Sequence, residues 1–359
     1  EPIAVADAAA VAVQALGEKP ESVEVNVSAN IIKNVKSVVV PCTGGLRGIG
    51  AAVCAGIVAG CPEKELEILE EITGEQKVEM KKMLDTMPMT IRESDKEYIF
   101  DIQIKACAGG HSGYVEIAGF HTNVICVKKD DEIIREKAYE EQGSSCATDR
   151  SLLTVEKIIE FADCVDVADV EEVLQRQIDY NWAIAEEGMT GKWGAAIGKT
   201  LMEAYGNSVH NRAKAMAAAG SDARMNGCEL PVVINSGSGN QGMTTSLPVI
   251  VYAKELNVSK EMMLRALVVS NLITIHMKTG IGRLSAYCGA ISAGCGAGAG
   301  ICYLYGGRAY EISHVIVNAV AINSGVVCDG AKASCAAKIA SAVEAGLLGL
   351  QMQKNGKQF

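Results

Sequence analysis

The sequence is poor in aromatic residues and has neither a long apolar run nor a basic stripe. Phe, Trp and Tyr make up 4% of its 359 residues, whereas hydrophobic residues make up 49%. The core must therefore consist of Ala, Val, Ile and Leu, which favours closely packed helices. No uninterrupted apolar run reaches the ~20 residues that span a bilayer, so we expect no membrane segment. The net charge of −10 without a basic stripe argues against nucleic acid as a partner.

The chain also lacks the signals of a secreted protein. Its 13 cysteines are an odd number, and no secretory signal accompanies them, which argues against a disulfide scaffold. We therefore expect free thiols in a reducing, cytoplasmic environment. The cysteines nearest the end, Cys328 and Cys335, do not form the C-x-x-C pair that is typical of a zinc finger.

Hydrophobic periodicity divides the chain into three zones. Residues 2–16, framed by Pro2 and Gly17, predict a helix that is apolar on nearly every side and is therefore buried against something large. From Leu152 to the end the pattern is helical. The zone between them is β-rich and contains one charged helix over residues 62–87. Its predicted strands cover residues 23–29, 37–43, 98–106, 114–120 and 123–129.

These zones predict an α+β protein with a polar boundary at residues 140–151. We expect residues 1–18 to form a helix that packs on the helical domain. Residues 19–146 should form a small inserted α/β domain with a mixed or antiparallel sheet. Residues 147–359 should form the largely helical C-terminal domain.

A Gly/Ser-rich segment over residues 236–242 is a candidate binding loop. Ser236, Ser238, Asn240 and Gln241 add hydroxyl and amide groups to several backbone N–H groups, a combination that binds a carboxylate or phosphate. The segment is neither a Walker A loop nor a dinucleotide fingerprint. The alternative is a solvent loop that caps a helix starting near Thr244.

Other polar residues are candidates for substrate contacts or proton transfer. Thr43 and Gly44 follow a predicted strand and could hold an anion, although a structural turn is an equally good interpretation. Lys278 and His121 are candidate bases, and a structural role is the alternative for His121. Lys278 and Arg283 could also anchor a carboxylate.

Three cysteines near the end of the chain have Gly- and Ala-rich surroundings, namely Cys288, Cys328 and Cys335. Small residues let the backbone approach a bulky object closely, so this pattern predicts a cradle for a compact inorganic group. Three thiolates without an adjacent fourth suit an iron–sulfur cluster with one open iron. Cys288, Cys295 and Cys302 recur every seven residues, about 10.5 Å along a helix. At most one of that series can therefore join Cys328 and Cys335, and any single cysteine could simply be a small buried hydrophobe.

Four segments together resemble the iron–sulfur-dependent serine dehydratase alpha-chain superfamily, and most closely its L-cysteine desulfidase branch. They are EPIAVA at 1–6, NSGSGNQG at 235–242, SAYCGAISAGCGAG at 285–298 and NSGVVCDGAKASCAAKIA at 323–340. The resemblance implies a 4Fe–4S cluster bound by Cys288, Cys328 and Cys335. Members of that family carry Cys-Thr directly before the Glu-Pro with which this chain begins. We therefore expect residues upstream of Glu1.

The resemblance further implies conversion of L-cysteine to pyruvate, ammonia and sulfide without pyridoxal phosphate. The open iron would act as a Lewis acid on the β-substituent, and a nearby base would remove the α-proton. The Gly/Ser loop, with Lys278 or Arg283, would hold the carboxylate of this small amino acid. Family analogy also suggests a homodimer. The alternatives are L-serine or L-threonine dehydration at the same site, a non-catalytic iron–sulfur protein, or a structural zinc protein.

Overall fold

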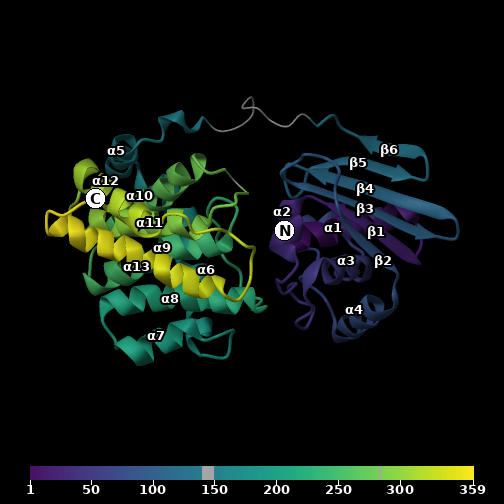
Figure 1. Ribbon diagram of the computed structural model, residues 1–359, viewed down its shortest axis with the longest axis horizontal. Helices are drawn as coiled ribbons and strands as arrows, with labels where there is room; N and C mark the ends of the chain where they lie inside the picture. Colours follow the sequence, from purple (N-terminus) through teal and green to yellow (C-terminus); the bar gives the residue numbers. More distant parts are fainter. Residues whose placement is uncertain (140–148, 283) are drawn as a thin grey trace. The chain divides into compact units, whose positions relative to one another are not determined.

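The computed structural model describes residues 1–139, 149–282 and 284–359. The chain forms two compact units, shown in Figure 1. The first contains Glu1–Ala147 and Asp329–Lys332, and the second contains Thr148–Cys328 and Ala333–Phe359. The predicted boundary between residues 146 and 147 lies outside the described residues. The first unit combines helices with a sheet and the second is helical, so the predicted α+β class is confirmed.

In its described residues, the first unit contains a six-stranded mixed sheet in the order β2-β1-β3-β4-β5-β6. β1 pairs with β2 in parallel, and the other neighbours are antiparallel. The strands are β1 (Ser22–Val27), β2 (Met89–Glu93), β3 (Asp101–Ala108), β4 (His111–Ala118), β5 (Val124–Lys129) and β6 (Glu132–Glu136). The helices are α1 (Pro2–Leu16), α2 (Ala29–Val35), α3 (Gly48–Ala59), the 3₁₀ helix η1 (Pro62–Glu67) and α4 (Gly74–Thr86).

Two predicted elements of this unit are wrong. Residues 37–43 do not form a strand: Val38, Val39 and Val40 are buried, but Val39 makes only an isolated bridge, to Arg47. The predicted helix over 62–87 is divided into η1 and α4. The division follows from a capping box, in which the Thr73 hydroxyl accepts the Gln76 N–H and starts a new helix. The strands β2 and β6, whose side chains are mostly exposed, were not predicted.

The first helix belongs to the first unit. That it packs on the helical domain stays a prediction. α1 contacts α3 on one side and strands β3, β4 and β5 on another (Figure 1). The approach is close because glycines face it. A Cβ at Gly56 of α3 would lie 1.9 Å from the Ala6 carbonyl oxygen, and one at Gly113 of β4 would lie 2.1 Å from that of Ala12. A helix that is apolar on nearly every side is buried here between a sheet and a second helix.

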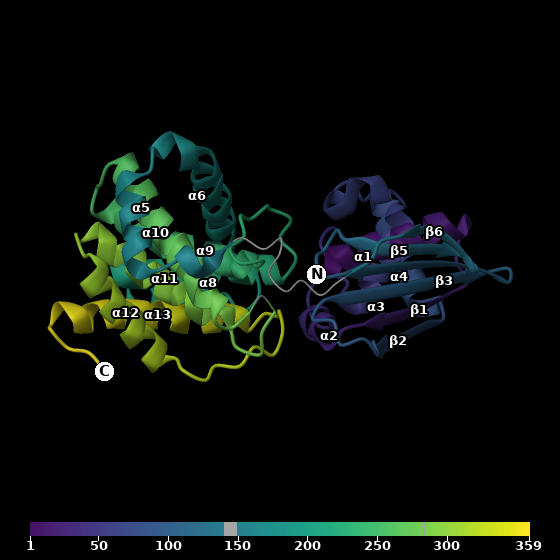
Figure 2. The same cartoon turned by 90° about the horizontal axis from the view of Figure 1, so that it is seen from above.

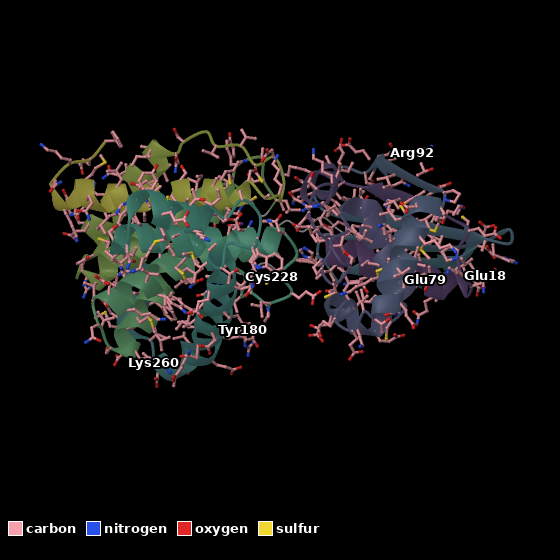
Figure 3. The ribbon with its side chains drawn as sticks, turned by 90° about the horizontal axis from the view of Figure 1, so that it is seen from below. Glu18, Glu79, Arg92, Tyr180, Cys228 and Lys260 are labelled. Atoms are coloured by element: carbon pink, nitrogen blue, oxygen red, sulfur yellow. The ribbon has the colours of Figure 1, made fainter. Side chains whose placement is uncertain are left out.

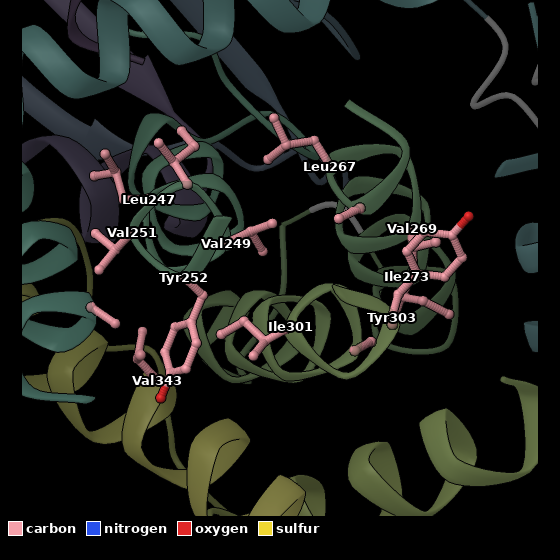
Figure 4. Packing of buried hydrophobic residues seen from close by; sticks show 14 of the residues in the cluster. Leu247, Val249, Val251, Tyr252, Leu267, Val269, Ile273, Ile301, Tyr303 and Val343 are labelled. Atoms are coloured by element: carbon pink, nitrogen blue, oxygen red, sulfur yellow. The ribbon is translucent and has the colours of Figure 1, made fainter. Parts of the chain in front are cut away.

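The second unit is a bundle of helices around a core of aliphatic residues. Figure 4 shows side chains of α9, α10 and α11 directed toward one another, among them Leu247, Leu267 and Ile301. Its elements are the 3₁₀ helix η2 (Arg150–Leu152), α5 (Val155–Cys164), α6 (Val167–Met189), α7 (Ile197–Tyr205), α8 (Val209–Met225), α9 (Gly239–Glu255), α10 (Lys260–Thr279), α11 (Gly289–Leu304), α12 (Ala309–Ile322) and α13 (Cys335–Lys354).

α11 is the central helix of this bundle and contacts α9, α10, α12 and α13. Its predicted close packing rests on glycine. A Cβ at Gly294 would lie 2.3 Å from the Ala342 carbonyl oxygen of α13, and one at Gly296 would lie 2.5 Å from the Ser270 carbonyl oxygen of α10. Polar residues such as Tyr180 and Lys260 lie at the outer surface of the bundle, as Figure 3 shows. None of the helices in the described ranges is both long and apolar enough to cross a bilayer.

We predict that Gly56→Ala destabilises the first unit by about 1–3 kcal/mol or more. The added Cβ meets backbone atoms of α1, which cannot rotate away as a side chain would. Gly74→Ala is the matched control because a Cβ at this helical glycine meets nothing within 4 Å. Urea unfolding followed by circular dichroism compares the two variants, and equal midpoints would contradict the close packing of α1 on α3.

Candidate functional site

Cys288 and Cys328 lie side by side on two short paired segments of the second unit. The Cys288 N–H donates to the Val326 carbonyl oxygen at 3.0 Å, and the Cys328 N–H donates to that of Ala286 at 2.7 Å. Cys288 immediately precedes α11 as its N-cap. This backbone pairing brings together two thiols that are 40 residues apart in the sequence.

Cys335 is the first residue of α13 and lies in the same neighbourhood. Burial raises the pKa of the Cys288 thiol, and the thiols of Cys328 and Cys335 raise this pKa further. The Ala290 N–H and the Lys338 ammonium group oppose this effect. Cys288 and Cys335 thus lie at two helix N-termini, where the helix dipole favours a thiolate.

Three thiols are a donor set that iron–sulfur clusters use. A structural zinc site requires sulfur atoms about 2.3 Å from one ion, which forces them close together. Across the described residues, no three His, Cys, Asp or Glu side chains converge in a way that would hold one ion. Thiolates that bind different irons of one cluster can stand further apart. The three thiols share one neighbourhood, and the cluster itself stays a prediction.

Cys295 and Cys302 lie further along α11 and are almost fully buried. Burial raises the pKa of each thiol to about 12. Cys295 packs among Ala319 and Ala345, and Cys302 packs against Gly307. Both are small buried hydrophobes in this fold.

The Gly/Ser-rich segment is a tight turn followed at once by a helix. Asn235 and Ser238 exchange backbone hydrogen bonds of 3.1 and 3.0 Å, and between them Ser236 and Gly237 have φ values of 49° and 81°. Two positive φ values are typical of a type I′ turn. The Ser238 hydroxyl then accepts the Gln241 N–H and caps α9. The helix therefore starts at Gly239, and the predicted start near Thr244 is wrong.

An amide network fixes this turn to the bundle. The Asn235 side chain donates to the Asn271 side-chain oxygen of α10 at 2.9 Å. Asn271 and Gln177 of α6 exchange two further amide hydrogen bonds of 3.0 and 2.8 Å. The Ser236 hydroxyl donates to the Asn235 side-chain oxygen. Because these amides are satisfied by one another, they hold the turn in a single orientation.

Gln241 connects this turn with the cysteine region. Its side chain lies against Gly289, the residue after Cys288: a Cβ at Gly289 would lie 2.6 Å from the Gln241 amide. Gln241 is 8% exposed, and its Oε1 atom has no hydrogen-bond partner within the described part of the chain. The neighbouring Asn240 receives a 3.4 Å hydrogen bond from Arg224. Gln241 thus offers a buried acceptor beside the first thiol.

Of the two predicted cationic residues, Lys278 and Arg283, the structure describes only Lys278. Lys278 is 3% exposed and lies in the last turn of α10, where its carbonyl oxygen accepts the Gly282 N–H. Its amino group is therefore largely withheld from solvent. Arg283 lies outside the described residues.

The remaining predicted residues, Thr43, Gly44 and His121, lie in the first unit. The Thr43 hydroxyl donates to the Val40 carbonyl oxygen at 2.7 Å, and Gly44 has a φ of 74°. Both residues serve the turn that leads into α3. His121 packs edge-on against the Phe100 ring, with 4.8 Å between centroids. Their predicted roles in binding and proton transfer stay predictions.

Sequence reasoning missed several residues that shape the site. Asn271 and Gln177 went unnoticed, although amides on otherwise apolar helix faces are a usable signal. Lys338 also went unnoticed; it follows Cys335 by one helical turn, which places both on one face. Another residue that went unnoticed is Glu344 of α13. Its carboxylate pairs with His210 at 2.9 Å and with Lys214 at 2.5 Å, and these two ion pairs anchor α13 to α8.

Sequence comparison gives independent matches. The sequence model of the serine dehydratase alpha chain family matches residues 63–359. A UPF0597 protein of Desulfitobacterium hafniense is 58% identical over 359 residues, which cover 100% of this chain and 84% of that relative. UPF0597 proteins of Lachnoclostridium phytofermentans and Treponema denticola are 50% and 42% identical, again over 100% of this chain and over 86% and 85% of their own lengths.

We predict that the Glu344 anchor stabilises the fold in a pH-dependent way. His210 and then Lys214 lower the pKa of Glu344 from 4.5 to about 2 against the opposing effect of burial. The folded pKa lies below the unfolded one, so this stabilisation is present above about pH 4.5 and is lost as the pH falls toward 2. Glu344→Gln should cost about 1 kcal/mol or less at pH 7, since the pair is partly exposed.

Urea unfolding at pH 7, 5 and 3 checks this, because the difference from the unsubstituted protein should be similar at pH 7 and 5 and smaller at pH 3. Glu203→Gln is the control, since Glu203 makes only an exposed 3.9 Å pair with Lys199. A difference that persists unchanged at pH 3 would contradict the anchor's electrostatic origin.

Proposed function

The chain belongs to the serine dehydratase alpha chain family, and from this we propose that it eliminates the β-substituent of a small amino acid. The proposed reaction converts L-cysteine and water to pyruvate, ammonia and hydrogen sulfide, and pyridoxal phosphate is not required. Cys288, Cys328 and Cys335 would hold a 4Fe–4S cluster. The proposal rests chiefly on the backbone pairing that places Cys288 beside Cys328, within electrostatic reach of Cys335.

A cluster held by three thiolates supplies an open iron, which acts as a Lewis acid toward the leaving group. The protein residues would do the rest. The N–H groups that open α9, presented by the Ser236–Gly237 turn, would bind the substrate carboxylate. The free Oε1 of Gln241 would accept a hydrogen bond from the substrate ammonium group.

Proton transfer completes the reaction. Lys278, buried at the end of α10, is the proposed acceptor of the α-proton, and His121 is the second candidate. Loss of that proton and of sulfide leaves an enamine, which takes a proton to become an imine. Water then converts the imine to pyruvate and ammonia. Burial of the site would protect the enamine until this step.

The leaving group distinguishes the proposal from its alternatives. L-Serine or L-threonine would bind through the same carboxylate and ammonium contacts and lose hydroxide instead of sulfide. A cluster that binds without turnover would indicate a non-catalytic protein. We also propose a homodimer, which sedimentation analysis of the anaerobically purified protein tests.

We predict that the anaerobically purified protein is brown, with a broad absorption band near about 400 nm that shifts when L-cysteine is added. Cys288→Ser, Cys328→Ser and Cys335→Ser should each lose this band and the release of pyruvate and sulfide. Cys295→Ala is the control, because Cys295 lies in the helix that Cys288 precedes but is buried among alanines. A protein that stays colourless after reconstitution with iron and sulfide would rule out the cluster and the mechanism.

We predict that Gln241→Met raises KM for L-cysteine by about tenfold while the absorption band is retained. Methionine keeps the length of the side chain but removes a buried acceptor beside Gly289, and a hydrogen bond to a charged group contributes about that factor. Gln175→Met on α6 is the control, since its amide makes only a 2.9 Å exposed contact with Asp179. If both variants bind L-cysteine equally well, Gln241 does not contact the substrate.

A further inference from the structure

A cavity of about 490 Å³ lies within the first unit, separate from the cysteine-bearing unit. α1, η1, the turn before β5, β5 itself and β6 surround it, and Figure 2 shows several of these elements. α1 contributes Asp7, Val11 and Gln14, which recur at helical spacing and so share one face. The residues that line this cavity have no role in the function proposed above.

Asp7 is the buried polar residue of this cavity. It is 3% exposed, and its Oδ1 atom has no hydrogen-bond partner in the described ranges. A buried carboxylate without a partner is costly, because it has lost water without gaining a donor. Burial, and then the nearby charge of Glu65, raises the pKa of Asp7 to about 6. Near neutral pH the carboxylate is therefore mostly ionised and requires a cation or donor.

The charged groups around Asp7 favour a positive ligand. Glu63 and Glu65 of η1 line the cavity, and Arg135 of β6 is the cationic residue among its lining groups. Glu63 already accepts a 2.8 Å hydrogen bond from Gln14. Three carboxylates against one guanidinium leave this cavity with an excess of negative charge.

Besides Gln14 and Thr122, the rest of the wall is apolar. Val11, Val124, Val127 and Ile134 line the cavity, and such side chains accept a short hydrocarbon body. A bare metal ion does not fit, because no three acidic, histidine or cysteine side chains of the described chain converge on one point. An ammonium group on an aliphatic body matches both the buried carboxylate and the apolar wall.

We propose that this cavity binds a small molecule through a primary ammonium group, which donates to the buried Asp7 carboxylate while its short aliphatic body packs on Val11 and Val124. Two sources carry this chemistry. A simple alkylamine would use Asp7 alone, and an α-amino acid would also place its carboxylate on Arg135. The excess of carboxylates favours binding in either case.

Isothermal titration calorimetry of the full chain tests this with two probes, n-propylamine and L-norvaline. Norvaline has no β-leaving group and cannot undergo elimination, so turnover does not interfere. Asp7→Asn keeps the shape of the side chain. It should weaken the binding of whichever of the two probes binds by about tenfold to a hundredfold. Glu24→Gln is the control, because Glu24 is an exposed acid of β1 that does not line the cavity.

Arg135→Gln separates the two sources. It should weaken norvaline but not propylamine if the ligand is an amino acid, and it should change neither value appreciably if the ligand is a simple amine. Affinity should also fall below about pH 6, as Asp7 takes up a proton. If neither probe binds, or if Asp7→Asn leaves binding unchanged, the proposal is wrong. Retention of the absorption band and of L-cysteine turnover in Asp7→Asn would show that such a failure leaves the proposed function intact.

Discussion

Close approach between backbones is the constraint on which the rest of this structure depends. Gly56 admits the backbone of Ala6, Gly294 admits that of Ala342, and in each case a Cβ would lie less than 2.4 Å from a carbonyl oxygen. Cores with few aromatic rings have little bulk with which to fill gaps, so helices must move together to reach native packing density. Glycine makes this possible at the cost of backbone entropy in the unfolded chain.

The cysteine region follows from the same constraint. α11 lies among α9, α10, α12 and α13. Its glycines admit the backbones of α10 and α13, and Gly289 at its N-terminus lies against the Gln241 side chain of α9. α13 packs on α11 at Gly294, which holds the N-terminal Cys335 of α13 on the same side of the bundle. Close packing along α11 and α13 thus sets where the cysteines at their N-terminal ends lie. A loop alone would not hold three thiols in register.

Much of this organisation was predictable, and the failures share a physical cause. Helix 2–16 and the helical second half follow from periodicity and from Pro2 and Gly17, which depend on local sequence alone. The packing partner of α1 was not predictable, because the sequence of a helix that is apolar on nearly every side does not indicate which surface it packs against. Residues 37–43 were misread because burial of three valines in a loop looks like a strand. Cysteine spacing limited the ligand set, but only the fold brought Cys288 beside Cys328.

Buried polar atoms without hydrogen-bond partners are of two kinds in the described part of this chain. The unpartnered oxygens of Asp101 and Asp222 belong to carboxylates whose other oxygen is satisfied, by Ser94 in the first case and by the Ile197 N–H in the second. Such groups hold the chain together and need no ligand. Gln241 and Asp7 differ, because one lies beside the Cys288 region and the other lines a cavity. At Asp7, open space next to an unsatisfied acceptor is a cost that folding does not explain, and a ligand that donates a hydrogen bond there would remove it.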